Sequence, residues 1–283
     1  MSIINSVAVI GSGTMGAGIA QVCAQAGMQV FLYDISAPAL EKARIGIEKN
    51  YQVAVEKGKL TAPDKLAAEQ RIRYTNEFTE LKADLCIEAI LEKLEVKRDL
   101  FLKLAAQNSA QCILASNTSS IPITQIAAGI EFPERVVGIH FFNPAHLMKL
   151  VEIIAGAETS PEVMNTAEAF VLKLGKTPVT AKDAPGFIVN RVARHYYVEA
   201  LKIMEENVTS FENIDRLMES SGFKMGPFRL MDLIGVDTNY SVTSSIYEQF
   251  AYDSKFRPSR IQKQKVDAGH WGKKRGKGFY NYN

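Results

Sequence analysis

The chain has 283 residues, and its 33 lysines and arginines nearly balance 31 aspartates and glutamates, leaving a net charge of +2. This balance gives no indication of a nucleic-acid-binding protein, and no apolar stretch reaches the length of a transmembrane helix. The length predicts one large or two medium domains with an ample core. Because the chain opens without a basic segment, we expect no signal peptide and a cytoplasmic location.

The three cysteines, Cys23, Cys86 and Cys112, all lie within apolar runs. In that setting cysteine behaves as a small buried hydrophobic residue. We therefore expect free thiols in a reducing compartment, with no disulfide and no metal site.

The first strand, turn and helix carry the most informative pattern in the chain. An apolar run at 6–10 is followed by Gly11, Gly13 and Gly16, and then by a helical pattern at 14–26. In such a pattern the glycines permit a tight turn, close approach of a pyrophosphate and close helix packing. The helix start, with Thr14 and Met15, directs its free N–H groups at the phosphates. We interpret the segment as a dinucleotide-binding loop rather than an ordinary glycine-rich turn, because its full context is present.

An acidic residue follows the second predicted strand, at 29–33. Asp34 stands at the end of this strand. A carboxylate there binds the ribose 2′-hydroxyl of NAD and repels the 2′-phosphate of NADP. The sequence therefore predicts NAD as the cofactor.

Strands and helices alternate up to about residue 183, which predicts an α/β fold with a Rossmann-like doubly wound sheet and extra strands at its later edge. The further strands are expected at 71–74, 84–88, 112–116, 135–140, 149–154 and 176–180. The helices between them are expected at 38–59, 64–70, 92–106, 123–128 and 161–174. This part, 1–183, is the predicted NAD-binding domain.

After a hinge at 183–186 the pattern becomes helical, which predicts a second, all-helical domain at 184–283. Its helices are expected at 187–206, 211–220, 230–250 and 258–268, with a terminal strand at 278–280.

Polar side chains fall where the sheet should converge them. Ser119 comes just after one strand and His140 ends another, which places both at the edge where α/β sheets bind ligands. If 135–140 and 149–154 form an antiparallel hairpin centred on His146, His140 faces Glu152 directly. A carboxylate fixes the tautomer of imidazole and favours its charged form, which suits a general base.

Each of these residues also has a structural interpretation. His140 could be a hydrogen-bonded core residue, and Ser119 or Asn190, near the start of the first helix after the hinge, could be a cap. Glu152 is harder to explain that way, because a carboxylate in an apolar strand requires a partner.

Several separate motifs together resemble the 3-hydroxyacyl-CoA dehydrogenase family over the whole chain, with the greatest similarity to bacterial 3-hydroxybutyryl-CoA dehydrogenases. They are VIGSGTMG at 9–16, SNTSS at 116–120, HFFNP at 140–144, MKLVE at 148–152, PGFIVNR at 185–191, GP at 226–227 and GKGFY at 276–280. One departure is His146-Leu147, where relatives often have Pro-Val.

The resemblance implies an NAD-dependent oxidoreductase that converts a (3S)-3-hydroxyacyl-CoA into a 3-ketoacyl-CoA, as in fatty acid β-oxidation. It implies catalytic or substrate-orienting roles for Ser119, His140, Glu152 and Asn190. Cofactor contacts are implied for Gly11, Gly13, Thr14, Met15, Gly16, Asp34, Glu92, Lys97, Ser119, Asn143 and Lys274. Substrate contacts are implied for Ser119, Asn143, Asn190 and Lys57, the last of them holding CoA. It also implies that substrate lies between the two domains and that the helical domain makes a homodimer.

Three questions stay open at this point. A non-catalytic NAD-binding protein of the same fold, such as the related lens protein, is disfavoured because both His140 and Glu152 are present. An NAD-sensing repressor would require a DNA-reading module, and none is visible. 3-Hydroxybutyryl-CoA is the preferred substrate; the alternative is 3-hydroxyadipyl-CoA of phenylacetate breakdown, whose carboxylate Arg229 could bind through its forked donors, although Arg229 could also be an exposed residue with a surface partner.

Overall fold

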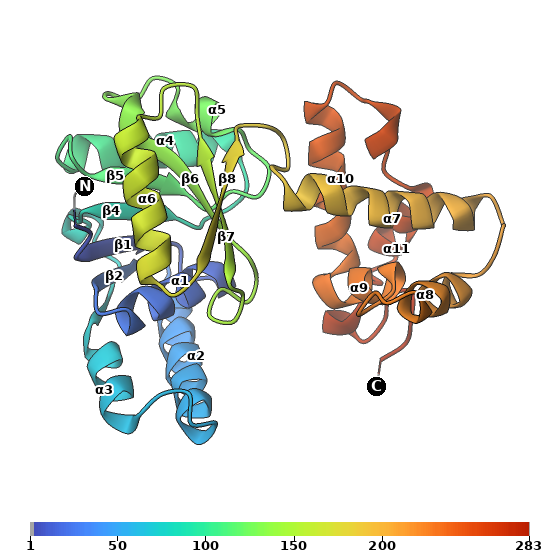
Figure 1. Ribbon diagram of the computed structural model, residues 1–283, viewed down its shortest axis with the longest axis horizontal. Helices are drawn as coiled ribbons and strands as arrows, with labels where there is room; N and C mark the ends of the chain where they lie inside the picture. Colours follow the sequence, from blue (N-terminus) through green and yellow to red (C-terminus); the bar gives the residue numbers. More distant parts are fainter. Residues whose placement is uncertain (1–2, 283) are drawn as a thin grey trace. The chain divides into compact units, whose positions relative to one another are not determined.

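The computed structural model describes residues 3–282, which form two compact units that divide between Ala184 and Pro185. The first unit is an α/β unit, and the second is built almost entirely of helices (Figure 1). Within the described part of the chain, no helix is both long enough and apolar enough to cross a membrane.

One sheet organises the first unit. Among the described residues it has eight strands in the order β3-β2-β1-β4-β5-β6-β7-β8. The strands from β1 to β6 run parallel, whereas β7 runs antiparallel to β6 and β8 runs parallel to β7. The predicted doubly wound sheet with additional later strands is confirmed. The strands are β1 Ser6–Ile10, β2 Gln29–Tyr33, β3 Ile72–Thr75, β4 Leu85–Glu88, β5 Ile113–Ser116, β6 Val136–Phe141, β7 Leu150–Ala155 and β8 Thr177–Lys182.

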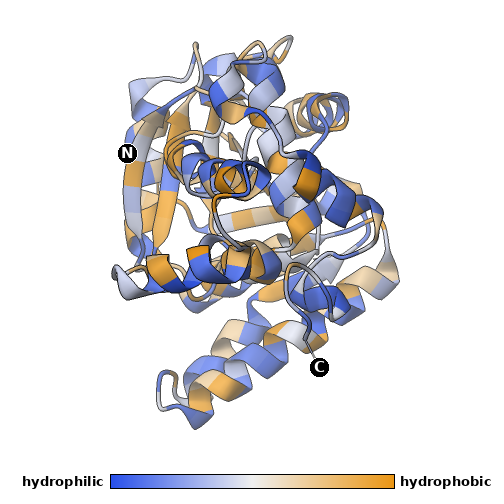
Figure 2. Ribbon diagram, turned by 90° about the vertical axis from the view of Figure 1, so that its right-hand side faces the viewer, coloured by the Kyte–Doolittle hydropathy of each residue, from blue (hydrophilic) through white to orange (hydrophobic). Residues whose placement is uncertain are grey.

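Helices cover the sheet, and α6 lies across one of its faces in Figure 1. The helices of this unit are α1 Thr14–Gln25, α2 Ala37–Glu56, α3 Ala62–Gln70, α4 Leu94–Gln107, α5 Ile123–Ala127 and α6 Pro161–Lys173, with short 3₁₀ turns η1 Phe78–Glu80 and η2 Pro133–Arg135. The strands are largely hydrophobic, while the helices alternate hydrophobic and hydrophilic positions (Figure 2). This pattern is typical of strands buried on both faces under amphipathic helices.

Side-chain alternation along the strands separates two faces of the sheet. Ile139 and Phe141 of β6, like Val151 and Ile153 of β7, belong to the core shared with α1, α2 and α6. Because successive strand residues point to opposite faces, His140 lies on the other face. Glu152 of β7 lies there for the same reason.

The second unit packs its helices around a core that includes Tyr197, Phe228 and Met231. Its helices are α7 Val189–Glu205, α8 Phe211–Ser220, α9 Pro227–Ile234, α10 Val236–Gln249 and α11 Arg260–Asp267, with 3₁₀ turns η3 Ser254–Phe256 and η4 Lys273–Arg275.

Two predictions for this unit are wrong. The helix expected at 230–250 is two helices, because Gly235 has φ +107° between α9 and α10, a conformation that L side chains rarely adopt. Residues 278–280 form no strand. The backbone N–H groups of Phe279 and Tyr280 instead donate to the carboxylate of Asp232, at 2.9 Å each, so a side chain replaces the expected strand partner.

Candidate active site

Two glycines of the turn between β1 and α1, Gly11 and Gly16, leave no room for a larger side chain. A Cβ on Gly16 would lie 1.7 Å from the carbonyl oxygen of Gly11, and one on Gly11 would lie 2.5 Å from that of Ala89. The space beside Gly13 is open, and no side chain caps the start of α1 at Thr14. An uncapped helix N-terminus beside open space suits a phosphate group. These residues therefore fit the pyrophosphate of a dinucleotide.

Asp34 lies directly after β2 and is fixed against the glycine-rich turn. Its Oδ2 accepts hydrogen bonds from the backbone N–H and the hydroxyl of Ser12, both at 2.9 Å. Its Oδ1 accepts from the backbone N–H of Ser36 at 3.0 Å. The carboxylate is thus held at the end of the strand, where a ribose binds in dinucleotide-binding folds.

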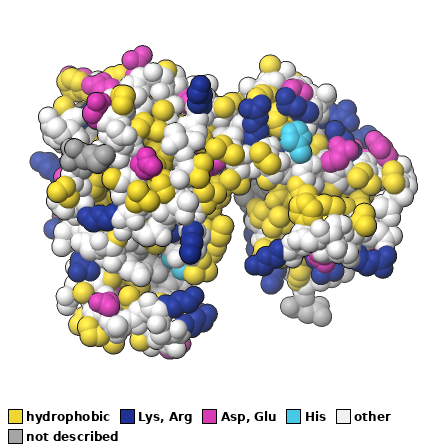
Figure 3. Space-filling view, viewed as in Figure 1, with side chains coloured by type: hydrophobic (Ala, Val, Ile, Leu, Met, Phe, Trp, Pro, Cys, Tyr) yellow, Lys and Arg dark blue, Asp and Glu magenta, His cyan; other side chains and the backbone are white. Residues whose placement is uncertain are grey.

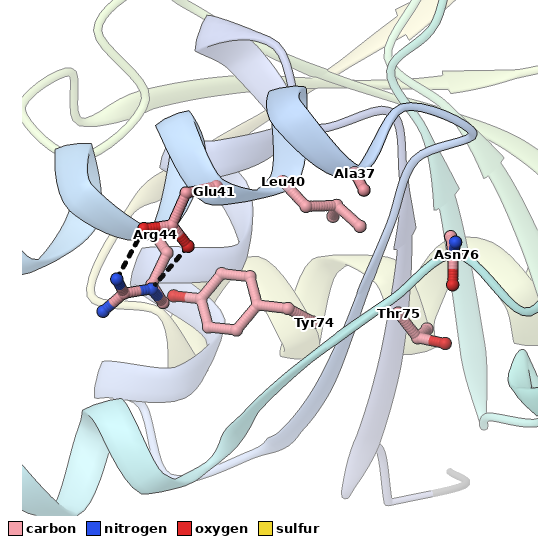
Figure 4. A pocket seen from close by; sticks show the side chains of 7 residues that line it. All are labelled: Ala37, Leu40, Glu41, Arg44, Tyr74, Thr75 and Asn76. Atoms are coloured by element: carbon pink, nitrogen blue, oxygen red, sulfur yellow. Dashed lines mark hydrogen bonds and ion pairs between the residues drawn. The ribbon is translucent and has the colours of Figure 1, made fainter.

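A cavity of about 200 Å³ lies between the start of α2 and the end of β3 (Figure 4). Arg44, the single arginine of α2, faces Glu41 there and bonds its carboxylate at 2.6 Å. It also bonds Glu48 at 2.5 Å. Arg44 is thus paired with two carboxylates of its own helix.

His140 and Glu152 face each other across β6 and β7. The antiparallel register pairs them directly, as the expected hairpin requires. The Nδ1 atom of His140 lies 2.8 Å from Oε2 of Glu152, and both side chains are buried. A buried carboxylate against Nδ1 favours the tautomer that carries its proton on Nδ1, so that Nε2 can act as an acceptor.

Ser119 lies on the opposite side of the imidazole, in the loop after β5. Its hydroxyl is 3.3 Å from Nε2 of His140. Asn117 of the same loop accepts a hydrogen bond from the backbone N–H of Phe141 at 2.8 Å, which ties the loop to the end of β6. The structure therefore brings Ser119, His140 and Glu152 into one continuous line.

A partly exposed hydrogen-bond network supports the loop that carries Ser119. Glu92 accepts hydrogen bonds from the hydroxyl of Thr118 at 2.5 Å and from the backbone N–H of Ser119 at 2.9 Å. Partial burial acts to raise the pKa of Glu92, but the ammonium of Lys97 and the Thr118 hydroxyl outweigh it and lower the pKa below its usual value. Glu92 therefore stays charged at neutral pH and holds the loop.

Lys97 connects this network to the core of the sheet. Its ammonium group lies 3.0 Å from Glu92 and 2.6 Å from Glu88, and only 1% of its side chain is exposed. Glu88, at the end of β4, also accepts from the hydroxyl of Ser116 at 2.6 Å and from the backbone N–H of Ile90 at 2.7 Å. Glu88 and Ser116 were not predicted from the sequence, although Glu88, like Asp34, is an acidic residue at the end of an apolar strand.

A groove of about 400 Å³ runs beside the glycine-rich turn, between α1, α2 and the turn that joins β6 to β7. Its polar lining includes Lys42, Asn50 and His146. Lys42 and Asn50 were not expected to contribute to the site. Lys57 does not line the groove and is exposed at the C-terminal cap of α2.

Lys176 fixes the backbone of the turn between β6 and β7 by hydrogen bonds. Asn143 is exposed at its start, and the Asn143–Pro144 peptide bond is cis. The Lys176 ammonium donates to the carbonyl groups of Ala145 and Met148, at 2.6 Å each. Burial, and then the charge of Lys176, lower the pKa of His146, which favours a neutral imidazole in this turn.

Three predicted residues belong to the helical unit. Asn190 is the second residue of α7. Lys274 lies in η4, with its ammonium 2.7 Å from the carboxylate of Asp237. Arg229 is 54% exposed and faces Glu219 at 3.5 Å and Asp215 at 3.8 Å.

Comparison with known proteins matches both units to one family. Residues 6–184 match the domain described as 3-hydroxyacyl-CoA dehydrogenase, NAD binding domain, and residues 186–282 match the C-terminal domain of the same family. The chain is 50% identical, over 99% of its length, to a 3-hydroxyadipyl-CoA dehydrogenase of Escherichia coli. It is 42% identical, over 97% of its length, to a probable 3-hydroxybutyryl-CoA dehydrogenase of Deinococcus radiodurans and covers 99% of that protein.

A solved structure agrees with these sequence matches. The crystal structure of a 3-hydroxybutyryl-CoA dehydrogenase from Escherichia coli superimposes with a TM-score of 0.96 at 49% identity, over 99% of this chain and 60% of that one. The chain likewise spans 59% of the Escherichia coli sequence relative. The predicted family and its NAD-binding domain are thus confirmed, and the chain belongs to the 3-hydroxyacyl-CoA dehydrogenase family.

Proposed function

We propose that the protein oxidises a (3S)-3-hydroxyacyl-CoA to the 3-ketoacyl-CoA with NAD, and catalyses the reverse reduction. The observation that carries this proposal is the line from Ser119 through His140 to Glu152, at the carboxyl edge of a sheet that also carries a dinucleotide-binding turn. Ligands bind at this edge in open α/β sheets.

In this proposal His140 is the general base. Its Nε2 takes the proton of the substrate hydroxyl, and Glu152 stabilises the resulting imidazolium through Nδ1. Ser119 and Asn190 orient the oxygen that changes from hydroxyl to carbonyl. NAD, when bound, supplies the acceptor for the hydride.

The cofactor would be held by the glycine-rich turn and by Asp34. Gly11, Gly13 and Gly16 fit the pyrophosphate by the absence of side chains, and the start of α1 adds its N–H groups. The remaining proposed contacts come from Glu92, Lys97, Ser119, Asn143 and Lys274. Of these, Lys97 acts at least in part through Glu92, because its ammonium is buried between two carboxylates.

The CoA moiety carries phosphates, and the groove beside α2 offers a cation for them. Lys42 lines this groove. Lys57, at the C-terminal cap of α2, does not line it. Lys42 would contact a CoA phosphate directly. Lys57 would attract the phosphates only over a longer distance, and this attraction is screened within about 8–10 Å at physiological salt.

A direct spectrophotometric assay of NADH formation by the purified protein tests the proposed function. NADH formation should follow addition of (3S)-3-hydroxyacyl-CoA thioesters of different acyl groups, including 3-hydroxybutyryl-CoA and 3-hydroxyadipyl-CoA. A protein that binds NAD but turns over none of them would be the non-catalytic member of the fold, and the proposal would fail.

Replacement of Asp34 tests the cofactor preference. Asp34→Ala should weaken NAD binding by about tenfold to a hundredfold, the usual loss for a hydrogen bond to a charged group. Use of NADP should change little or improve, because the repulsion of its 2′-phosphate is removed. The measurement is kcat/KM for both cofactors, with Lys49→Ala, a surface change on α2, as the control. Equal use of NAD and NADP by the unmodified protein would contradict the prediction.

We also propose that the helical unit forms a homodimer. Hydrophobic side chains gather on the face of this unit seen in Figure 3. Exposed apolar residues include Val192 on α7 and Leu233 and Ile234 on α9, two helices that pack together. Ile246 of α10 is buried and does not contribute to this surface. Such exposed apolar surface is typical of a subunit interface.

Sedimentation equilibrium should accordingly give a mass near twice that of one chain. Leu233→Glu should shift the distribution towards monomer, since a charge would then be desolvated in the interface. Leu66→Glu, at an exposed apolar position in the α/β unit, is the matched control and should leave the mass unchanged. A mass of one chain at every concentration would exclude the dimer. With three free, buried thiols, the chain also suits a reducing compartment, and we propose a cytoplasmic location.

A further inference from the structure

His146 is a half-buried histidine that faces a groove instead of a partner within the protein. It lies in the turn between β6 and β7 and lines the groove of about 400 Å³ beside the glycine-rich turn. Its imidazole forms no hydrogen bond or ion pair with any residue of 3–282. An imidazole in this position is available to a ligand in the groove, because its two ring nitrogens can donate or accept hydrogen bonds.

The backbone that carries His146 is fixed against α1. The ammonium group of Lys176 donates to the carbonyl groups of Ala145 and Met148, on either side of His146. Ala145 also packs closely on α1, since a Cβ added to Gly18 would lie 3.0 Å from the Cβ of Ala145. His146 is therefore held at one place along the groove.

Asn50 of α2 reaches the same part of α1. Its side-chain amide nitrogen donates to the side-chain oxygen of Gln21 at 3.0 Å. Gln21 follows Gly18 by three residues, so it lies about 4.5 Å further along α1 and on the same face. Asn50 and His146 thus lie at the same end of the groove. Lys42, eight residues before Asn50, lies about 12 Å away along α2. A ligand that carries phosphates at two places, as CoA does, can contact both ends.

The charges around His146 favour an anion. The ammonium of Lys176 faces it from the start of β8, and Lys42 lines the groove from α2. On α1, burial raises the pKa of Cys23 to about 12, which keeps this thiol neutral. Of the described residues that line the groove, none is acidic. Burial and then the charge of Lys176 lower the pKa of His146, so its imidazole is neutral while the groove is empty. A phosphate placed beside it would favour the imidazolium instead.

We propose that His146 binds a phosphate group of CoA in its protonated form, so that binding of the acyl-CoA takes up a proton and strengthens as the pH falls. This inference rests on the proposed function, in which the groove holds the CoA moiety. The phosphate raises the pKa of His146 in the complex above its value in the free protein. The stabilisation of the complex is therefore complete below the pKa of the free protein and is lost as the pH rises through the pKa of the complex.

Calorimetric titration of the unmodified protein tests the proposal without any variant. The probe is butyryl-CoA, which lacks the 3-hydroxyl group and does not react, added in the presence of NAD. Titration in two buffers of different ionisation enthalpy should show net proton uptake at neutral pH. The dissociation constant should be about tenfold lower near pH 6.5 than near pH 8.5, as expected for one charge-assisted hydrogen bond. A dissociation constant that does not change over this range would overturn the proposal.

Three variants assign the proton to His146. His146→Gln should weaken binding about tenfold near pH 6.5 but little near pH 8.5, and should abolish the proton uptake. His270→Gln is the matched control, because burial and the charges of Lys277 and Lys265 also lower the pKa of that half-buried histidine in the helical unit. It should leave the uptake unchanged. Lys42→Met should weaken binding by a similar factor at every pH, since lysine does not change its charge in this range.

The same titration with butyryl-3′-dephospho-CoA identifies the phosphate. Loss of the His146-dependent uptake assigns the contact to the 3′-phosphate, and its persistence assigns it to the pyrophosphate; each result supports a phosphate contact. Undiminished proton uptake in His146→Gln, or an equal loss of affinity at both pH values, would overturn the inference while leaving the dehydrogenase function intact. Absence of any binding of butyryl-CoA to the unmodified protein would instead refute the proposed function.

Discussion

Replacing His140 with glutamine is expected to lower turnover by about 10²–10⁴-fold, the usual contribution of general acid–base catalysis. Glutamine keeps a polar side chain opposite Glu152 but cannot take up the substrate proton. Since Asp34 and the glycine-rich turn are unaffected, NAD binding should stay close to normal. The measurements are single-turnover rates and NAD titration, with thermal unfolding to confirm the fold.

His195→Gln is the matched control for this variant. His195 is an exposed histidine on α7 whose ring lies 5.3 Å from that of Phe256, and it has no part in the proposed chemistry. Its replacement should leave turnover unchanged. If His140→Gln kept near-normal turnover, the assignment of the base would be wrong.

Removal of the buried ammonium group in Lys97→Met is expected to lower the free energy of unfolding by about 3–5 kcal/mol. This is the usual loss when one partner of a buried ion pair is removed, because the other charge stays buried and uncompensated. Here the uncompensated group is Glu88, which is fully buried at the end of β4. Urea-induced unfolding, followed by both fluorescence and circular dichroism, measures the change.

A double variant separates the uncompensated charge from the loss of packing. Glu88→Gln combined with Lys97→Met removes both charges and should recover part of the stability. The surface pair of Lys65 and Glu69, with a 3.0 Å separation, gives the comparison. Lys65→Met should change stability by only about 0–1 kcal/mol. A loss in Lys97→Met no larger than that would show that the buried pair contributes little.

Local patterns in the sequence were sufficient to predict the sheet and the pairing of His140 with Glu152. The Val- and Ile-rich runs identify the buried strands, and the antiparallel pairing of β6 with β7 follows from the short turn around His146. Once that hairpin is assumed, alternation alone places His140 opposite Glu152.

Features that depend on tertiary contacts could not be predicted from local sequence patterns. The break at Gly235 was missed because hydrophobic periodicity continues from α9 into α10, and the segment at 278–280 was misassigned because Asp232 replaces a strand partner.

The most direct test of the account is NADH formation by the purified protein from a (3S)-3-hydroxyacyl-CoA and NAD, measured alongside His140→Gln. The expected result is steady turnover that depends on both substrates, with a loss of about 10²–10⁴-fold in the variant. Absence of NADH formation with every thioester tested, or equal rates in the two proteins, would contradict it.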